Sequence, residues 1–473
     1  MRAILCHPDT PILSTAAAVL AAFLVCGLLV PPLFGLFLAA AVVAGIALLA
    51  LRFPTGFCAG WLLIAGMSLE MTVHDMIGDE AYQPVIAAIK GSGIGLALLC
   101  AVRFGPRLDL LSPVWAFLAM LVAGLTHGLY PGVTASDSLR SFIGSAAPFV
   151  FGFARVPRSW ADAIVRAAKW CPPVALAAAL PFAAAGIRPL FIDSGGARLQ
   201  GLGHPAFLAF VCLPAIYACL IELYRLGRRG DLALLAINGL ILVLTGARAP
   251  LFYAAAVTGL ALATIRSTVF AAADRIALVL AMLTALPVLA VLAGSLDDIR
   301  LFNVAVNETA NLSGRDLLWP LFQAAAEQSP WFGWGMGAGN AVIPAGGHVA
   351  QMLHTWAAHN EYLRIGVEGG TIGRTLLIAL CAAWVIAHTH ALSPPDRRIL
   401  RLAFLALAGH ALTDNVLIST PACVFFAFAA AVFARGRGGS ACFVRAGPRL
   451  GGFGRPAVGP VCRAYRPGDA APR

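Results

Sequence analysis

Apolar runs separated by short polar segments follow one another along nearly the whole chain. Most runs come close to the roughly 20 residues that an α-helix needs to cross the hydrocarbon core of a bilayer. We therefore predict about fourteen membrane spans, or about twelve or thirteen if the weakest runs do not cross. The predicted spans lie near residues 12–30, 33–51, 56–70, 85–102, 110–130, 141–154, 162–186, 205–224, 231–247, 249–265, 276–294, 363–387, 399–416 and 419–434.

This pattern predicts an all-α fold, a polytopic membrane helix bundle with one large polar loop. The predicted parts are a first section of the transmembrane bundle at 1–294, the loop at 295–362, the C-terminal transmembrane helices at 363–434 and a tail at 435–473. The tail holds 9 Gly, 5 Pro and 8 Arg in 39 residues. Such a composition cannot bury a core, so we expect the tail to be disordered.

Composition excludes a water-soluble enzyme. Hydrophobic residues make up 60% of the chain and charged residues 12%, against roughly 45–50% and 25% in soluble globular domains. The 11 cysteines fall mainly inside apolar runs and show no CxxC spacing. They are therefore interpreted as small buried hydrophobic residues, without a disulfide framework or a zinc site.

The distribution of positive charge predicts the orientation of the chain. When Lys and Arg are counted on alternate sides of the predicted spans, 24 of the 33 fall on one side. Cytoplasmic segments of membrane proteins carry the excess of cations. We therefore expect both termini, including the basic tail, in the cytoplasm, and the 295–362 loop on the outer side. The net charge of +11 then reflects topology and possible contact with membrane lipid, and no nucleic-acid partner is expected.

Nine Lys and Arg residues fall on the predicted outer side, where cations are scarce, and Arg198, Arg248 and Arg315 are among them. A guanidinium group suits a planar, bidentate grip on phosphate. Snorkelling of each side chain to the lipid headgroups is the alternative. Several outward arginines beside a histidine-bearing loop favour a functional site.

The outer loop also holds His348, His354 and His359. Their spacings of six and five residues differ from the i, i+4 arrangement of zinc-binding helices, and no cysteine joins them. We therefore expect no metal site. A solvent-exposed loop histidine is the simplest interpretation of each residue taken alone.

Several of these segments, in their order along the chain, resemble the O-antigen ligase and O-antigen polymerase superfamily of bacterial polytopic membrane glycosyltransferases. The resemblance covers about residues 190–375. It rests on Arg198-x-x-Gly201 with Pro205, Thr245-Gly-Ala-Arg248, Gly314-Arg315 with Trp319, the run from Pro330 to Gly337, His359-Asn-x-Tyr-Leu363 and Gly370-x-x-Gly373.

The resemblance implies transfer of a glycan from an undecaprenyl diphosphate carrier to an acceptor sugar hydroxyl, on the periplasmic face of the bacterial inner membrane. It implies no cofactor, nucleotide sugar or metal. Arg198, Arg248 and Arg315 would bind the diphosphate, and His359 would act as the general base. Asn360 and Tyr362 would support the site.

The acceptor distinguishes two activities within this superfamily. A ligase transfers the glycan to the lipid A core, whereas an O-antigen or exopolysaccharide polymerase transfers it to a second carrier-linked glycan. A lipid-linked glycan flippase or secondary transporter is the alternative from another class, although such proteins usually place polar residues near the bilayer midplane in two related halves. No internal repeat is evident in this chain.

Other charged residues have structural interpretations. Arg364 and Glu368 are spaced i, i+4 on one predicted helix, which favours a local ion pair. Asp414 lies outward between the last two spans and is expected to cap a helix, with a role in the site as the less favoured alternative. Lys90 and Arg374 lie in or beside spans, where structural pairing and substrate contact are equally plausible.

Overall fold

The structure of the chain, a computed structural model, describes residues 45, 50–193, 196–267, 270–281, 315–344, 347–353, 355 and 357–437, with the backbone alone at 79–81. These residues all belong to one unit of the chain, residues 1–438. The predicted span at 12–30, most of the spans at 33–51 and 276–294, and the tail beyond residue 437 lie outside the described residues.

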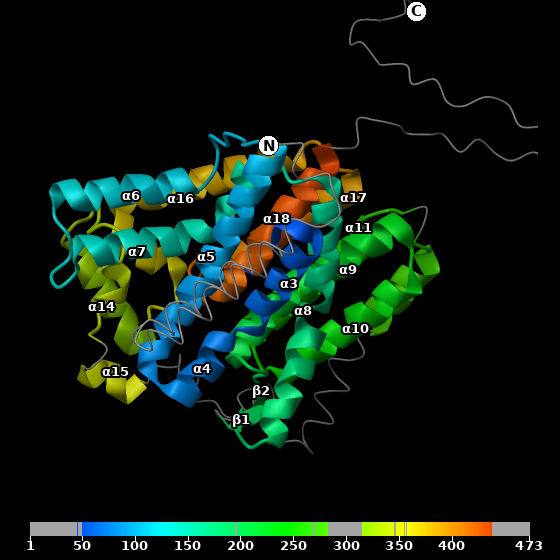
Figure 1. Cartoon of the computed structure of the whole chain (residues 1–473), viewed down its shortest axis with the longest axis horizontal. Helices are drawn as coiled ribbons and strands as arrows, with labels where there is room; N and C mark the ends of the chain where they lie inside the picture. The colour runs from blue at the N-terminus through cyan, green and yellow to red at the C-terminus, as the bar shows by residue number, and fades with distance from the viewer. Residues whose placement is uncertain are drawn as a thin grey trace, which may run out of the picture. The chain divides into compact units, whose positions relative to one another are not determined.

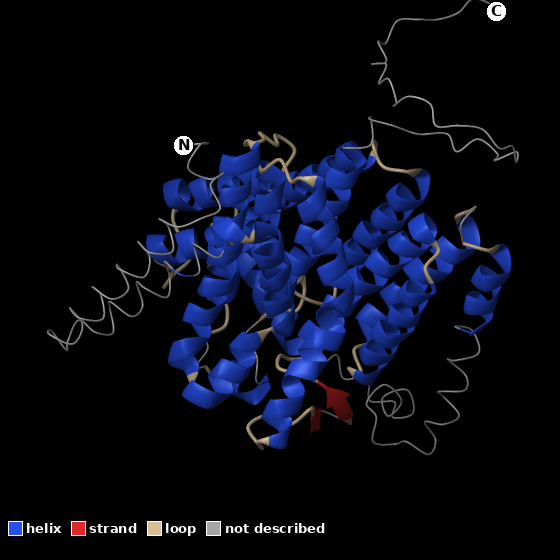
Figure 2. Cartoon of the chain, turned by 45° about the vertical axis from the view of Figure 1, so that its right-hand side comes forward, coloured by secondary structure: helices blue, strands red, loops and turns tan. Residues whose placement is uncertain are grey.

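The prediction of an all-α polytopic bundle is confirmed, and nearly all regular structure in Figure 2 is helical. The labelled helices are α3 (Pro54–Met67), α4 (Leu69–Ile77), α5 (Asp79–Phe104), α6 (Val114–His127), α7 (Ala135–Ala146), η2 (Ala147–Phe153), α8 (Arg158–Ala184), α9 (Pro205–Leu226), α10 (Arg229–Leu244), α11 (Arg248–Thr264), α14 (Arg315–Glu327), η3 (Ala338–Asn340), α15 (His348–Leu353), α16 (Glu361–Thr389), α17 (Pro394–His410) and α18 (Thr420–Arg437). Residues 272–281 are helical as well.

Four helices of the described residues are long and apolar enough to cross a membrane: the Tyr82–Phe104 part of α5, and α8, α9 and α16. Helices α3 and α4, bent by 58° where they join, could form a fifth crossing as a pair. Other predicted spans are shorter helices. The run at 110–130 contains α6 with 14 residues, and the run at 249–265 contains α11 with 17.

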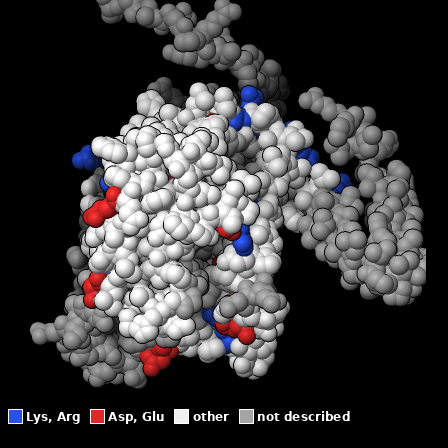
Figure 3. Space-filling model, turned by 90° about the vertical axis from the view of Figure 1, so that its left-hand side faces the viewer, with Lys and Arg blue, Asp and Glu red and all other residues white. Residues whose placement is uncertain are grey.

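Helix α9 forms the centre of the bundle, next to α8, α10 and α18 (Figure 1). Its sequence is apolar on all sides, as expected for a helix without a solvent-facing stripe, and 89% of its most apolar window is buried. Large hydrophobic side chains on peripheral helices are exposed instead, for example Val102 at 83% and Leu405 at 69%. Figure 3 shows broad areas of one face without Lys, Arg, Asp or Glu. Such a surface suits contact with lipid tails.

A two-stranded hairpin precedes α9, between the predicted spans at 162–186 and 205–224. Strand β1 (Phe191–Asp193) pairs antiparallel with β2 (Ala197–Leu199), and Ile192 lies opposite Arg198. The buried Arg188 holds the end of the hairpin by donating to the Gln200 side chain at 2.9 Å and to the Gly203 carbonyl at 2.6 Å. The hairpin thereby fixes where Arg198 enters the bundle.

Helix α16 is interrupted at Gly370, whose φ of 58° and ψ of −159° are not helical. A loop at residues 330–335 satisfies the backbone groups that the break exposes. The amides of Trp334 and Gly335 donate to helix carbonyls before the break, at 2.9 Å each. Helix amides after the break donate to the carbonyls of Pro330 and Trp331, at 2.8 and 3.0 Å. The loop and the broken helix therefore form one hydrogen-bonded element.

Gly333 and Gly335 lie where this loop packs against the backbones of α16 and α6. Gly333 adopts a φ of +70°, and a Cβ added there would lie 2.5 Å from backbone atoms of α16. A Cβ at Gly335, whose φ is +81°, would lie 2.7 Å from the Cα of Gly124 on α6. Glycine is therefore required for the close approach of backbone to backbone.

A buried ion triad stabilises the first half of α16. Arg364 donates to Glu368 at 2.7 Å, which confirms the predicted i, i+4 pair, and also to Glu361 at 3.1 Å. All three side chains are at most 3% exposed. Glu368 also accepts from the Gly337 amide at 3.2 Å. Arg364 is thus the shared cationic partner of both carboxylates, and it offsets part of the cost of burying them.

Candidate functional site

Two of the predicted site residues meet at the turn between α17 and α18. Arg315, the first residue of α14, donates from Nη2 to the Thr413 carbonyl at 2.7 Å. His359, just before α16, places Nδ1 3.5 Å from Oδ1 of Asp414. We call residues 413–414 the acceptor turn, because both contacts end on its oxygens. It brings together segments that lie almost 100 residues apart.

The third predicted residue at this place is Arg248, the first residue of α11, whose side chain is exposed. Burial lowers the pKa of the Arg315 guanidinium; the nearby carboxylate of Asp414 raises it and the positive charge of Arg248 lowers it. Because the charges of Asp414 and Arg248 both act on Arg315, both residues lie near it. Two guanidinium groups beside one carboxylate leave an excess of positive charge, which suits a polyanionic ligand.

His359 adopts a left-handed backbone conformation, with φ at 46°. Such a conformation costs a non-glycine residue about 1–3 kcal/mol and persists where the surroundings impose it. Its ring is held on both sides, by Asp414 at Nδ1 and by the Thr355 hydroxyl 3.0 Å from Nε2. The side chain remains 38% exposed. His359 is therefore positioned by its neighbours and still accessible.

Asp414, for which a role in the site was the less favoured prediction, contacts two histidines. Instead of serving mainly as a helix cap, its side chain lies between two histidines, His359 at 3.5 Å and His410 at 3.9 Å. A carboxylate beside Nδ1 favours the tautomer in which Nδ1 carries the proton and Nε2 presents a lone pair. The available signal was its position on the same predicted outer side as His359.

His204 was not predicted as a site residue and lies in the same electrostatic neighbourhood. Burial, followed by the positive charge of Arg198, lowers the pKa of His204 to about 4, and the charges of Asp414 and His359 also act on it. At neutral pH the ring is therefore uncharged. Its Nδ1 accepts from the Ala206 amide at 3.2 Å as the N-cap of α9, which leaves Nε2 as a neutral hydrogen-bond donor.

Arg198 is buried at 9% exposure and donates from Nε to the Thr245 carbonyl at 3.0 Å. Thr245 is the C-cap of α10, and Gly246 turns the chain with φ at 63° before Arg248 begins α11. The segment around Arg198 is thereby joined to the Thr245–Arg248 segment. Arg198 supports the backbone that presents Arg248, in addition to any contact with a ligand.

The two predicted supporting residues anchor the start of α16. Asn360 is its N-cap and accepts from the amides of Tyr362 and Leu363 at 3.0 and 3.2 Å. The Tyr362 hydroxyl donates to the Ala408 carbonyl on α17 at 2.9 Å. Trp319 of α14 donates to the Ala358 carbonyl at 3.0 Å. These bonds fix the backbone on both sides of His359.

Of the other two loop histidines, His348 begins α15, and His354 lies outside the described residues. Among the three, His359 is the one for which the structure shows a carboxylate contact.

Residues 233–378 match the family model described as O-Antigen ligase. No curated protein matches the chain. The matched segment contains Arg248, Arg315 and His359, whereas Arg198 and Asp414 lie outside it.

Proposed function

The chain belongs to the O-antigen ligase family through residues 233–378, and on that premise we propose that it transfers a glycan from undecaprenyl diphosphate to a sugar hydroxyl of the lipid A core. Glycosyl transfer of the ligase or polymerase type is the activity of this family. The observation that carries the assignment of the site is the convergence of Arg315 and His359 on the acceptor turn, with Arg248 close by.

The donor supplies a good leaving group, so the protein has two tasks. Arg248 and Arg315 hold the diphosphate and neutralise the charge that grows on it as the bond between the anomeric carbon and the phosphate oxygen breaks. Arg198, on strand β2 of the hairpin, also helps to bind the diphosphate in this proposal. The electron pair of the broken bond stays on undecaprenyl diphosphate, which leaves. No metal ion takes part in the proposed reaction.

His359 performs the second task as general base. The oxygen of the acceptor hydroxyl forms the new bond to the anomeric carbon, and its proton passes to Nε2 of His359. In the structure the Thr355 hydroxyl occupies the position next to Nε2, at 3.0 Å. Asp414 keeps the ring in the required tautomer and stabilises the imidazolium that forms.

The polymerase activity remains the alternative, because both reactions use the same donor and the same chemistry. The lipid-linked glycans that accumulate in cells without the protein distinguish the possibilities. We expect full-length carrier-linked chains, as a ligase requires. Single repeats exposed on the outer face would identify a polymerase instead. Repeats that remain on the inner face would contradict both activities and indicate a flippase.

We further propose that the site faces the periplasm from the inner membrane. The structure supports this proposal because arginines of the predicted cytoplasmic side lie at helix ends remote from the acceptor turn. Arg435 binds Asp162 near the start of α8, and Arg398 donates to the Thr264 carbonyl at the end of α11. A reporter active only outside the cytoplasm is expected to work when fused after Ile343 and to fail when fused after Arg228. The reverse pattern would contradict the proposed orientation.

Replacing Arg248 or Arg315 by lysine is expected to lower transfer about tenfold or more, although the charge is kept. Lysine presents a compact ammonium and cannot form the planar, bidentate hydrogen bonds of a guanidinium with phosphate. The measurement is the rate of transfer by purified protein from a defined carrier-linked glycan. Arg140→Lys is the matched control, because Arg140 contacts Gln83 and not the acceptor turn. Full activity of both variants at normal abundance would remove these arginines from the site.

A further inference from the structure

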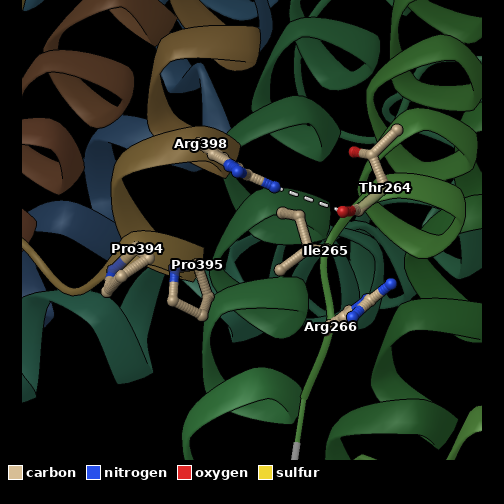
Figure 4. A pocket seen from close by; sticks show the side chains of 6 residues that line it. All are labelled: Thr264, Ile265, Arg266, Pro394, Pro395 and Arg398. Atoms are coloured by element: carbon tan, nitrogen blue, oxygen red, sulfur yellow. Dashed lines mark hydrogen bonds between the residues drawn. The ribbon is translucent and has the colours of Figure 1, made fainter.

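A cavity of about 310 Å³ lies between the end of α11 and the beginning of α17 (Figure 4). Its lining residues are Thr264, Ile265, Arg266, Pro394, Pro395 and Arg398. Helix α11 begins at Arg248 and α17 ends at His410, so the cavity lies at the ends of these helices that are remote from the acceptor turn. With 17 residues in α11, the separation along the helix is about 25 Å.

The lining of the cavity carries two guanidinium groups and no carboxylate. Arg398 donates to the Thr264 carbonyl at 3.2 Å, and Arg275 donates to the Ile265 carbonyl. The carbonyls at the end of α11 are thus already occupied by cations. Arg266 is exposed, and the described part of the chain gives it no ion pair. The cavity therefore presents positive charge that lacks an anionic partner.

Apolar side chains continue from the cavity along the outside of both helices. Leu260 lies one turn before Thr264 and is 48% exposed, and Leu405 lies two turns after Arg398 and is 69% exposed. Residues at these spacings share a helix face. A molecule with an anionic head at Arg266 and Arg398 could therefore lay hydrocarbon chains over the two leucines.

We propose that this cavity binds the phosphate headgroup of an anionic phospholipid from the surrounding leaflet. Guanidinium groups bind phosphodiesters through charge-assisted hydrogen bonds. Basic pockets between membrane helices on the cytoplasmic side bind anionic headgroups in the same manner. The apolar surface beyond Leu260 and Leu405 favours a lipid over free phosphate. This binding site is separate from the proposed glycan transfer.

Native mass spectrometry of the full-length protein tests the proposal. The purified protein is incubated with phosphatidylglycerol or with phosphatidylcholine of the same acyl chains, and the bound lipid is quantified. We expect preferential retention of phosphatidylglycerol. Arg266→Gln should lower this retention about fivefold, the scale of one arginine near an anionic headgroup. Combining it with Arg398→Gln should lower the retention further.

The control variant combines Arg228→Gln with Arg229→Gln, two exposed arginines outside the cavity, and is expected to retain phosphatidylglycerol normally. Arg266→Gln alone leaves the bond between Arg398 and Thr264 intact, so its effect does not depend on the contact between α11 and α17. Equal retention of both lipids would overturn the proposal. Unchanged retention of phosphatidylglycerol by the variant that combines Arg266→Gln with Arg398→Gln would overturn it as well. So would thermal stabilisation by inorganic phosphate equal to that by phosphatidylglycerol, since it would indicate a site for free phosphate.

Discussion

His359→Ala is expected to lower glycan transfer by about 10²-fold or more while the protein remains folded and still binds the carrier-linked donor. Loss of a general base has this typical magnitude. The arginines at the acceptor turn do not depend on the imidazole, so donor binding should persist. Transfer is measured with purified protein, a defined carrier-linked glycan and an acceptor, and donor binding is measured separately with the same variant.

His354→Ala is the matched control for this experiment, because it removes another histidine from the same loop. It should change the rate much less. Asp414→Asn provides a second comparison, since an amide can contact the ring but cannot stabilise an imidazolium in the same way. We expect an intermediate loss, with a pH profile altered from that of the unmodified protein. A near-normal rate for His359→Ala would refute its assignment as the base.

Arg364→Met is expected to destabilise the protein by about 3–5 kcal/mol, the usual cost of removing one partner from a buried ion pair. The substitution leaves Glu361 and Glu368 in the bundle without their cation, and each is at most 3% exposed. The measurement is the free energy of unfolding in detergent by chemical denaturation. Transfer should fall as well, because this half of α16 begins next to His359.

Arg374→Met is the control on the same helix, since Arg374 forms no ion pair with the described residues. Its effect on stability should be small. Adding Glu361→Gln and Glu368→Gln to Arg364→Met should recover part of the loss, because neutral amides cost less to bury than carboxylates. If Arg364→Met were as stable as the unmodified protein, the triad would contribute nothing to the fold.

Local patterns were sufficient for much of the fold. Apolar runs predict the helices because a membrane helix must present apolar side chains to its surroundings. The pair of Arg364 and Glu368 follows from helical spacing alone and is confirmed. The hairpin before α9 was not predicted, because strands of three residues carry no recognisable alternation. The break at Gly370 was not predicted either, since it depends on a loop that supplies hydrogen bonds from outside the helix.

The candidate site was likewise predicted in part, by its residue types but not by its tertiary contacts. The outward arginines and His359 stand out by residue type in an apolar chain. The contact between His359 and Asp414 joins residues 55 positions apart, and the length of the two intervening helices decides whether they meet. His204 was not predicted, because its burial near Arg198 follows from tertiary packing.

The broken helix α16 also constrains the order of events when the chain is made. Residues 330–335 are synthesised before Gly370, yet they supply the hydrogen bonds that the break requires. Open carbonyls and amides are costly in lipid. In the proposed orientation, helix α16 can therefore reach its final place in the bilayer only after the preceding loop has crossed the membrane and folded back onto it. We therefore expect final insertion of this span to depend on prior folding of the 330–335 loop, which lies between Arg315 and His359 in the sequence.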